Sequence, residues 1–206
     1  MAWKNDQVTK EETDKIIEIA RKVLSVPGDY VEMGCYKGDT SLVLADILRN
    51  HQIESCGKLV ENSDGQAKKL WIYDSFEGLP EKSKEDASAL GVDFKGGELF
   101  ITKREVKERF LRAGLPVPVI KKAWFSDLTK ADLPEKISFA FLDGDFYESI
   151  RDSLKLIESK MGDGGIVIVH DYANPQLPGV AKAVDEWLTK RRLKTYMYKS
   201  MIIIYF

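Results

Sequence analysis

Acidic side chains and a histidine follow two apolar runs in the second half of the chain. The run ISFAFL leads into Asp143 and Asp145, and the run GIVIV leads into His170 and Asp171. Two such runs in succession predict neighbouring parallel strands, whose carboxyl ends meet at one edge of a sheet. Four polar groups gathered there could hold a divalent ion, because oxygen ligands suit Mg²⁺ and the ion offsets the repulsion between carboxylates. A single strand-end acid is often only structural, but two clusters on one edge favour a functional site.

The segment VEMGCYKGDTS, residues 31–41, has the composition of a ligand-binding turn. Gly34 and Gly38 allow the backbone to approach a ligand closely, and a helix beginning near Thr40 would offer free N–H groups. Glu32 precedes the first glycine, and the spacing of the glycines differs from the Gly-x-Gly-x-x-Gly pattern of dinucleotide-binding turns. The turn therefore disfavours a nicotinamide cofactor, and the chain contains no P-loop pattern. An ordinary strand-to-helix turn is the alternative.

A further carboxylate, Asp74, ends the apolar run KLWIYD. A carboxylate at this place can accept hydrogen bonds from both hydroxyls of a ribose, and Phe76 could stack on an adenine. A loop-capping role for Asp74 is the alternative.

The remaining reactive residues are expected to be structural. Cys35 has no plausible histidine partner for a catalytic thiolate, since the chain contains only His51 and His170. His51 stands at a helix end, where a cation suits the helix dipole. Cys35 and Cys56 are too few for a disulfide framework or a four-thiolate zinc site, and they suggest a reducing compartment.

Length and composition predict one α/β domain over residues 1–206, because 44% hydrophobic content is enough for one sizeable core. The net charge of −2 leaves no electrostatic excess for gathering nucleic acid or anionic lipid. The polar N-terminus resembles no signal peptide, and no apolar run approaches the roughly 20 residues of a membrane-spanning helix. We therefore expect a cytoplasmic protein with no nucleic-acid or membrane partner, and a homo-oligomer remains open.

The elements that must position these residues follow from hydrophobic periodicity and capping signals. Strands alternating with helices predict a mostly parallel sheet covered on both faces, closed by an antiparallel hairpin. Residues 51–68 are expected to form an irregular surface connection, and residues 76–100 a cover over the site. The expected helices are 9–26, 40–50, 102–113, 149–159 and 179–191, and the expected strands are 30–33, 69–74, 117–121, 137–143, 165–170, 196–199 and 201–206.

Four motifs together resemble the class I S-adenosylmethionine-dependent methyltransferases. They are Glu-x-Gly-x-x-x-Gly at the first expected strand, IYDSFEGLP at the second, LDGDFYES at the fourth and HDY after the fifth. Within that class the chain is most similar to the macrocin O-methyltransferase (TylF/MycF-type) family, which methylates sugar hydroxyls in macrolide and aminocoumarin antibiotics. The similarity extends from about Gly28 to Arg191. It implies a Rossmann-like three-layer sandwich with a seven-stranded sheet and a C-terminal antiparallel hairpin.

The resemblance also implies roles for individual residues. Asp143 and the acid after the fifth strand, Asp171, would bind Mg²⁺, and Asp145 would be the general base. S-adenosylmethionine would be held by the glycine turn and by the segment after the second strand. The residues expected to bind this cofactor are Glu32, Gly34, Tyr36, Gly38, Ser41, Asp74, Ser75 and Phe76.

His170 is the position at which the chain departs from this family. The family usually has two acids before the tyrosine after the fifth strand, whereas this chain has His170 and Asp171. The oxygen ligands suit Mg²⁺, whereas imidazole suits Zn²⁺, Mn²⁺ or Fe²⁺ better than Mg²⁺. The expected metal is therefore Mg²⁺, with Mn²⁺ as the alternative. His170 is expected to be a metal ligand with Asp143 and Asp171, a group that supports a ligand, or a catalytic base.

These observations predict a metal-assisted O-methyltransferase that acts on a small hydroxylated molecule such as a sugar or a catechol-like diol. Nucleic-acid base methylation is disfavoured, since such enzymes carry an Asn/Asp-Pro-Pro-aromatic motif where this chain has Asp-Gly-Asp-Phe. A non-catalytic cofactor-binding or scaffolding module is the alternative from a different class, although the polar cluster at the strand ends argues against it.

Overall fold

The structure is a computed structural model that describes residues 7–54, 66–90 and 94–206. Cys56 and most of the irregular connection expected at residues 51–68 lie outside the described residues. No helix in the described part of the chain combines the length and the apolar character needed to cross a membrane.

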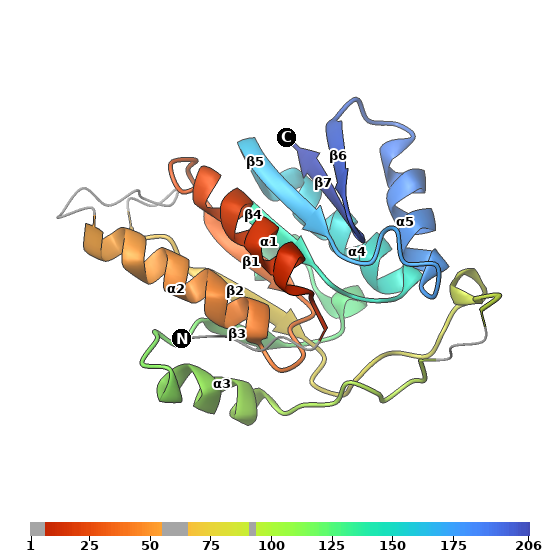
Figure 1. The fold of residues 1–206 in the computed structure, drawn as a ribbon, viewed down its shortest axis with the longest axis horizontal. Coiled ribbons are helices and arrows are strands. Elements are labelled where there is room, and N and C mark those ends of the chain that lie inside the picture. Colours follow the sequence, from red (N-terminus) through yellow and green to blue (C-terminus); the bar gives the residue numbers. More distant parts are fainter. Residues whose placement is uncertain (1–6, 55–65, 91–93) are drawn as a thin grey trace.

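Seven strands form one sheet in the order β3-β2-β1-β4-β5-β7-β6 (Figure 1). Strands β1 to β5 pair in parallel, and β7 lies antiparallel between β5 and β6. This arrangement confirms the mostly parallel seven-stranded sheet with a C-terminal antiparallel hairpin. The strands are β1 Asp29–Met33, β2 Leu70–Asp74, β3 Val119–Lys122, β4 Ile137–Leu142, β5 Met161–Val169, β6 Lys194–Tyr198 and β7 Met201–Tyr205.

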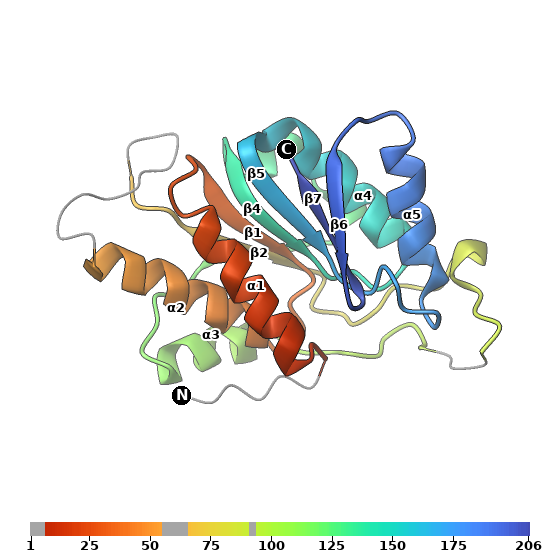
Figure 2. The ribbon, with the colours of Figure 1, turned by 45° about the horizontal axis from the view of Figure 1, so that its top comes forward.

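Helices cover both faces of the sheet, which confirms the three-layer sandwich (Figures 1 and 2). One apolar core joins α1, α2 and α3 to one face, and a second joins α4 and α5 to the other. The central strands β1 and β4 are buried along their whole length, as expected for parallel strands that pack on both faces. The helices are α1 Lys10–Lys22, α2 Asp39–Glu54, α3 Lys103–Arg112, α4 Tyr147–Ile157 and α5 Pro178–Leu188, with short 3-10 helices at Lys84–Asp86, Phe125–Asp127, Lys130–Asp132 and Glu158–Lys160.

Three element boundaries differ by four residues from the sequence-based expectation. Helix α1 ends at Lys22 rather than at residue 26. Helix α2 continues to Glu54 rather than ending at Asn50. Strand β5 begins at Met161, four residues before the expected Gly165. Gly164 adopts a positive φ of 80°, and the register between β4 and β5 shifts at this place. The glycines therefore form an irregularity inside the strand instead of ending it.

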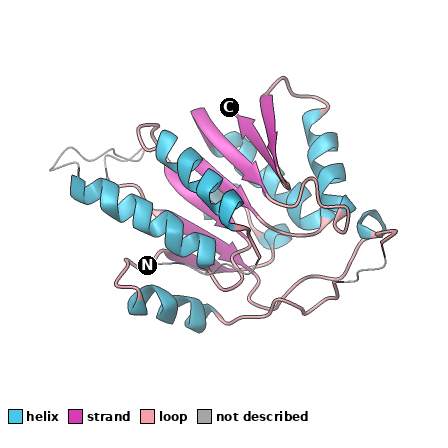
Figure 3. Ribbon diagram, in the orientation of Figure 1, coloured by secondary structure: helices cyan, strands magenta, loops and turns pink. Residues whose placement is uncertain are grey.

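The long connection that follows β2 begins at the edge toward which the parallel strands point (Figure 3). The carboxyl ends of β1, β2, β4 and β5 meet there, and this is where open α/β sheets bind their ligands.

Candidate active site

A pocket of about 840 Å³, including its opening to solvent, lies at this edge of the sheet. Nine of the residues expected at the site line it. They are Glu32, Gly34, Tyr36, Asp74, Ser75, Asp143, Asp145, His170 and Asp171.

Gly34 brings the ends of β1 and β4 together at the floor of the pocket. Its φ is +88°, and a Cβ there would lie 2.0 Å from the carbonyl oxygen of Asp143. The Gly34 N–H donates to Tyr73 O at 2.9 Å, and the Asp143 N–H donates to Met33 O at 2.9 Å. Only glycine fits this close approach, so the residue fixes the glycine turn against the acidic cluster.

Asp74 braces the glycine turn. Its Oδ2 accepts hydrogen bonds from the backbone N–H groups of Cys35 at 2.8 Å and Tyr36 at 3.3 Å. Its Oδ1 accepts from the N–H of Phe76 at 2.8 Å. The loop-capping role is therefore present in the structure. A carboxylate has about four acceptor sites, so some capacity remains for a ribose hydroxyl.

Glu32 is a buried acid on the pocket wall, 1% exposed. Burial, followed by the negative charges of Asp143 and Asp74, raises the pKa of its carboxyl well above the ordinary value. Ser41 donates its hydroxyl hydrogen bond to Glu32, so Ser41 supports the wall without lining the pocket. A buried acid of this kind can receive the ammonium group of a ligand.

Phe76 is buried and does not line the pocket. Its ring is 4% exposed and belongs to the same apolar core as Val106 and Phe110. The segment that follows β3 places Trp124 and Phe125 on the pocket wall. The stacking role expected of Phe76 stays a prediction, and Gly38 likewise does not line the pocket.

His170 lies between two carboxylates. Its Nδ1 is 2.9 Å from Asp143 Oδ1 and 3.0 Å from Asp171 Oδ2. Its Nε2 is 3.8 Å from Glu12 Oε2. Burial alone would lower the pKa of His170, but Asp143, Asp171 and Glu12 outweigh burial and raise it.

Asp143, His170 and Asp171 offer donor atoms that lie within 4.8 Å of one another. Ligands that each lie 2.0–2.2 Å from one ion stand roughly 3 Å apart when they are adjacent in its coordination shell. The two distances from His170 Nδ1 match that spacing. The residues present therefore fit a divalent ion held by two carboxylates and one imidazole.

Asp145 adopts a positive φ of 59° and faces the same pocket. Burial, and then the charges of Asp143 and Asp171, raise the pKa of its carboxyl well above the ordinary value. A carboxylate whose pKa is raised is a stronger proton acceptor once it is ionised, which suits a general base.

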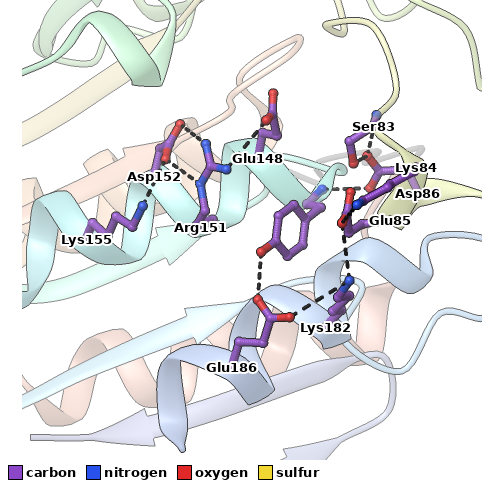
Figure 4. A network of polar contacts seen from close by, with 11 residues as sticks. Ser83, Lys84, Glu85, Asp86, Glu148, Arg151, Asp152, Lys155, Lys182 and Glu186 are labelled. Carbon is purple, nitrogen blue, oxygen red and sulfur yellow. Dashed lines mark hydrogen bonds and ion pairs between the residues drawn. The ribbon is translucent and has the colours of Figure 1, made fainter. Parts of the chain in front are cut away.

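A segment of the expected cover is anchored to α4 and α5 (Figure 4). The buried Asp86 accepts a hydrogen bond from the Tyr147 N–H, in the first turn of α4, at 2.7 Å. It also accepts from the N–H and the hydroxyl of Ser83 at 3.0 and 2.7 Å. A Cβ on Gly179, at the start of α5, would lie 1.9 Å from Asp86 Oδ1. The cover is therefore docked onto the amino ends of α4 and α5.

Sequence reasoning missed three residues near the site: Glu12, Trp124 and Phe125. Trp124 and Phe125 follow β3, so the strand-end rule would have found them if apolar residues had been considered. Glu12 forms a capping box with Thr9 at the start of α1, and nothing in the local pattern shows that its carboxylate reaches His170.

The fold and the site define the Rossmann-like methyltransferase class. The solved structure of the O-methyltransferase NovP is similar with a TM-score of 0.77 and 26% identity, covering 94% of this chain and 78% of that chain. Residues 7–204 match the sequence model of the macrocin-O-methyltransferase (TylF) family, and the chain belongs to this family.

The chain is also similar in sequence to two curated O-methyltransferases. One is the 8-demethyl-8-(2,3-dimethoxy-alpha-L-rhamnosyl)-tetracenomycin-C 4'-O-methyltransferase of Streptomyces olivaceus, 32% identical over 72% of this chain. The other is the demethyldecarbamoylnovobiocin O-methyltransferase of Streptomyces niveus, 28% identical over 81% of this chain. The chain spans 54% of the length of the first and 60% of the second.

Proposed function

We propose that the protein is an S-adenosylmethionine-dependent O-methyltransferase that acts on a hydroxyl of a sugar or of another small diol of the natural-product type. One observation carries this proposal: the glycine turn and the cluster of Asp143, Asp145, His170 and Asp171 line a single pocket. The named O-methyltransferases among its relatives support the reaction type.

The cofactor half of the pocket is the part around the glycine turn. Glu32 would receive the ammonium group of the cofactor, because a cation offsets the cost of ionising a buried acid. Asp74 would accept a hydrogen bond from a ribose hydroxyl, and Trp124 and Phe125 provide apolar surface for the adenine ring. Tyr36 and Ser75 line the same region.

Methyl transfer from a sulfonium is an in-line displacement, in which the S–CH₃ bond breaks as the O–CH₃ bond forms. The protein must therefore align one acceptor hydroxyl with the methyl group and remove its proton. Asp145 is the proposed base, and it would take the hydroxyl proton onto its carboxylate.

Asp143, His170 and Asp171 would hold a divalent ion, Mg²⁺ or Mn²⁺. When bound, the ion would act as a Lewis acid that lowers the pKa of the acceptor hydroxyl. We favour a ligand role for His170 over a base role, because Nδ1 already faces both carboxylates and Asp145 supplies a base.

The proposal is tested by incubating the protein with S-adenosylmethionine and an acceptor, with and without EDTA. The acceptors are rhamnosylated natural products and simple catechols, and mass spectrometry detects the methylated product. Metal-dependent methylation of one acceptor is expected. Full activity in chelator would remove the metal from the proposal. Cofactor binding with no methylation of any acceptor would favour a non-catalytic module.

A further inference from the structure

Glu12, in the first turn of α1, lies on the Nε2 side of the His170 ring, opposite the side that faces Asp143 and Asp171. Its carboxylate oxygen Oε2 is 3.8 Å from His170 Nε2. Both side chains are buried, with Glu12 3% exposed and His170 5% exposed. The carboxylate and the imidazole are thus buried together, and their electrostatic interaction is stronger there than in water.

Four hydrogen bonds fix the orientation of this carboxylate, and their donors, Thr9 and Ser200, lie far apart in the sequence. Oε2 accepts from the N–H and the hydroxyl of Thr9 at 3.1 and 2.7 Å. Oε1 accepts from the N–H and the hydroxyl of Ser200, in the turn between β6 and β7, at 3.2 and 2.5 Å. Glu12 therefore meets His170 as a rigid group, with little conformational entropy left to lose.

The Nε2 atom of His170 is buried and makes no hydrogen bond within the described part of the chain. Glu12 Oε2 is the carboxylate oxygen found at ion-pair distance from it. A histidine that binds a metal through one nitrogen generally donates its other N–H to a carboxylate, a carbonyl or water, which fixes the tautomer and the ring orientation. The fixed negative charge of Glu12 faces this nitrogen and favours a proton on it.

We propose that Glu12 is a positioning residue for His170: it keeps a proton on Nε2 and thereby leaves Nδ1 to act as a metal donor beside Asp143 and Asp171. This inference rests on the proposed metal-assisted function. It gives the N-terminal cap of α1 a second role, as a support for the active site.

Helix α3 shows that capping alone does not explain Glu12. Thr102 and Glu105 form the same capping box, with hydrogen bonds of 2.9 and 2.6 Å to Glu105 Oε2. Glu105 is exposed, and it does not line the pocket. The chain thus offers two identical caps, of which one faces solvent and the other faces the metal-donor cluster.

Glu12→Gln is the test variant, and Glu105→Gln is its matched control. Calorimetric titration with MnCl₂ should show affinity about 10- to 100-fold weaker in Glu12→Gln and unchanged in Glu105→Gln. The chain contains two histidines, so ¹⁵N-histidine spectra are readily assigned with His51 as an internal reference. With diamagnetic Zn²⁺, His170 should keep a proton on Nε2 in the wild type and lose that fixed pattern in Glu12→Gln.

Should Glu12→Gln fail to fold, Glu12→Asp is the second variant. Its shorter side chain keeps the charge but places it farther from Nε2, so the Mn²⁺ affinity of this variant should also fall. Equal metal affinity and unchanged His170 signals in a folded Glu12 variant would overturn the inference while leaving metal assistance intact. A wild-type protein that binds no divalent ion would overturn metal assistance and this inference with it.

Discussion

Asp74 both shapes the glycine turn and offers oxygen atoms to a ligand. Replacing Asp74 with alanine removes charge-assisted hydrogen bonds, each worth roughly 1.5–3 kcal/mol. We expect Asp74→Ala to weaken S-adenosylhomocysteine binding at least about tenfold in calorimetry. Glu77→Ala, an exposed acid three residues away, is the control and should bind as the wild type does. Unchanged affinity in Asp74→Ala would remove the residue from the cofactor site.

His170 and Asp145 can be separated by one pair of variants. His170→Asp restores an all-oxygen donor set, so it should preserve or strengthen the use of Mg²⁺. Asp145→Asn removes the proposed base and should lower turnover by roughly 10²-fold or more while leaving the metal requirement in place. Metal dependence and pH–rate profiles of both variants provide the measurement. Near-wild-type turnover in Asp145→Asn, with His170→Asp inactive at saturating metal, would reverse the two assignments.

Among the elements, the short 3-10 helix Lys84–Asp86 connects the cover to the amino ends of α4 and α5. Removing Asp86 leaves the Tyr147 N–H without its partner, which costs on the order of 1–3 kcal/mol. Asp86→Ala should therefore make the cover more sensitive to limited proteolysis and raise KM for the acceptor more than it lowers kcat.

Glu85→Ala is the matched control for Asp86→Ala because it changes the adjacent residue of the same helix. Its ion pair with Lys182, at 3.3 Å, has a partner that is 46% exposed, and such pairs contribute less than about 1 kcal/mol. A cover that is equally protected in Asp86→Ala and Glu85→Ala would show that Asp86 is not the anchor.

The elements that carry the fold could be predicted from the sequence because each strand and helix has its own hydrophobic period. The four polar residues after β4 and β5 could also be predicted to gather, since parallel strands end at one edge. The burial of Phe76 could not be predicted, because an aromatic residue after a strand can enter the core as readily as the pocket, and local sequence does not decide between them. Glu12 was missed because its partners, His170 and Ser200, are brought to it only by tertiary packing.

At the scale of the whole molecule, the end of the sheet opposite the pocket is closed by Lys68. Its Nζ donates to Gly28 O at 2.5 Å and to Ser138 Oγ at 2.8 Å, as well as to Val26 O, and the residue is 4% exposed. Burial lowers the pKa of this ammonium group to about 8, although Asp29 partly offsets the effect.

A lowered lysine pKa has a definite sign in the pH dependence of stability. Between pH 8 and 10 the unfolded chain binds more protons at Lys68 than the folded protein does, so the free energy of unfolding gains a term that rises with pH. The stability of the wild type relative to Lys68→Met should therefore increase by about 1–3 kcal/mol over this range, measured by urea unfolding. Lys69→Met, the exposed neighbour, should show no such change relative to the wild type. A constant difference between the wild type and Lys68→Met would contradict the burial effect.

The contact between Glu12 and Ser200 also bears on when the site can form during synthesis. The two residues are 188 positions apart, and Lys199 beside Ser200 pairs with Glu11. Contacts of such long sequence separation form late, because the closure of a long loop must be compensated by other native contacts. A nascent chain can build β1 to β5 and present Asp143, His170 and Asp171 before the final hairpin leaves the ribosome. Glu12 can be locked beside His170 only after that hairpin docks, so competence for metal binding should mature after the parallel sheet has folded.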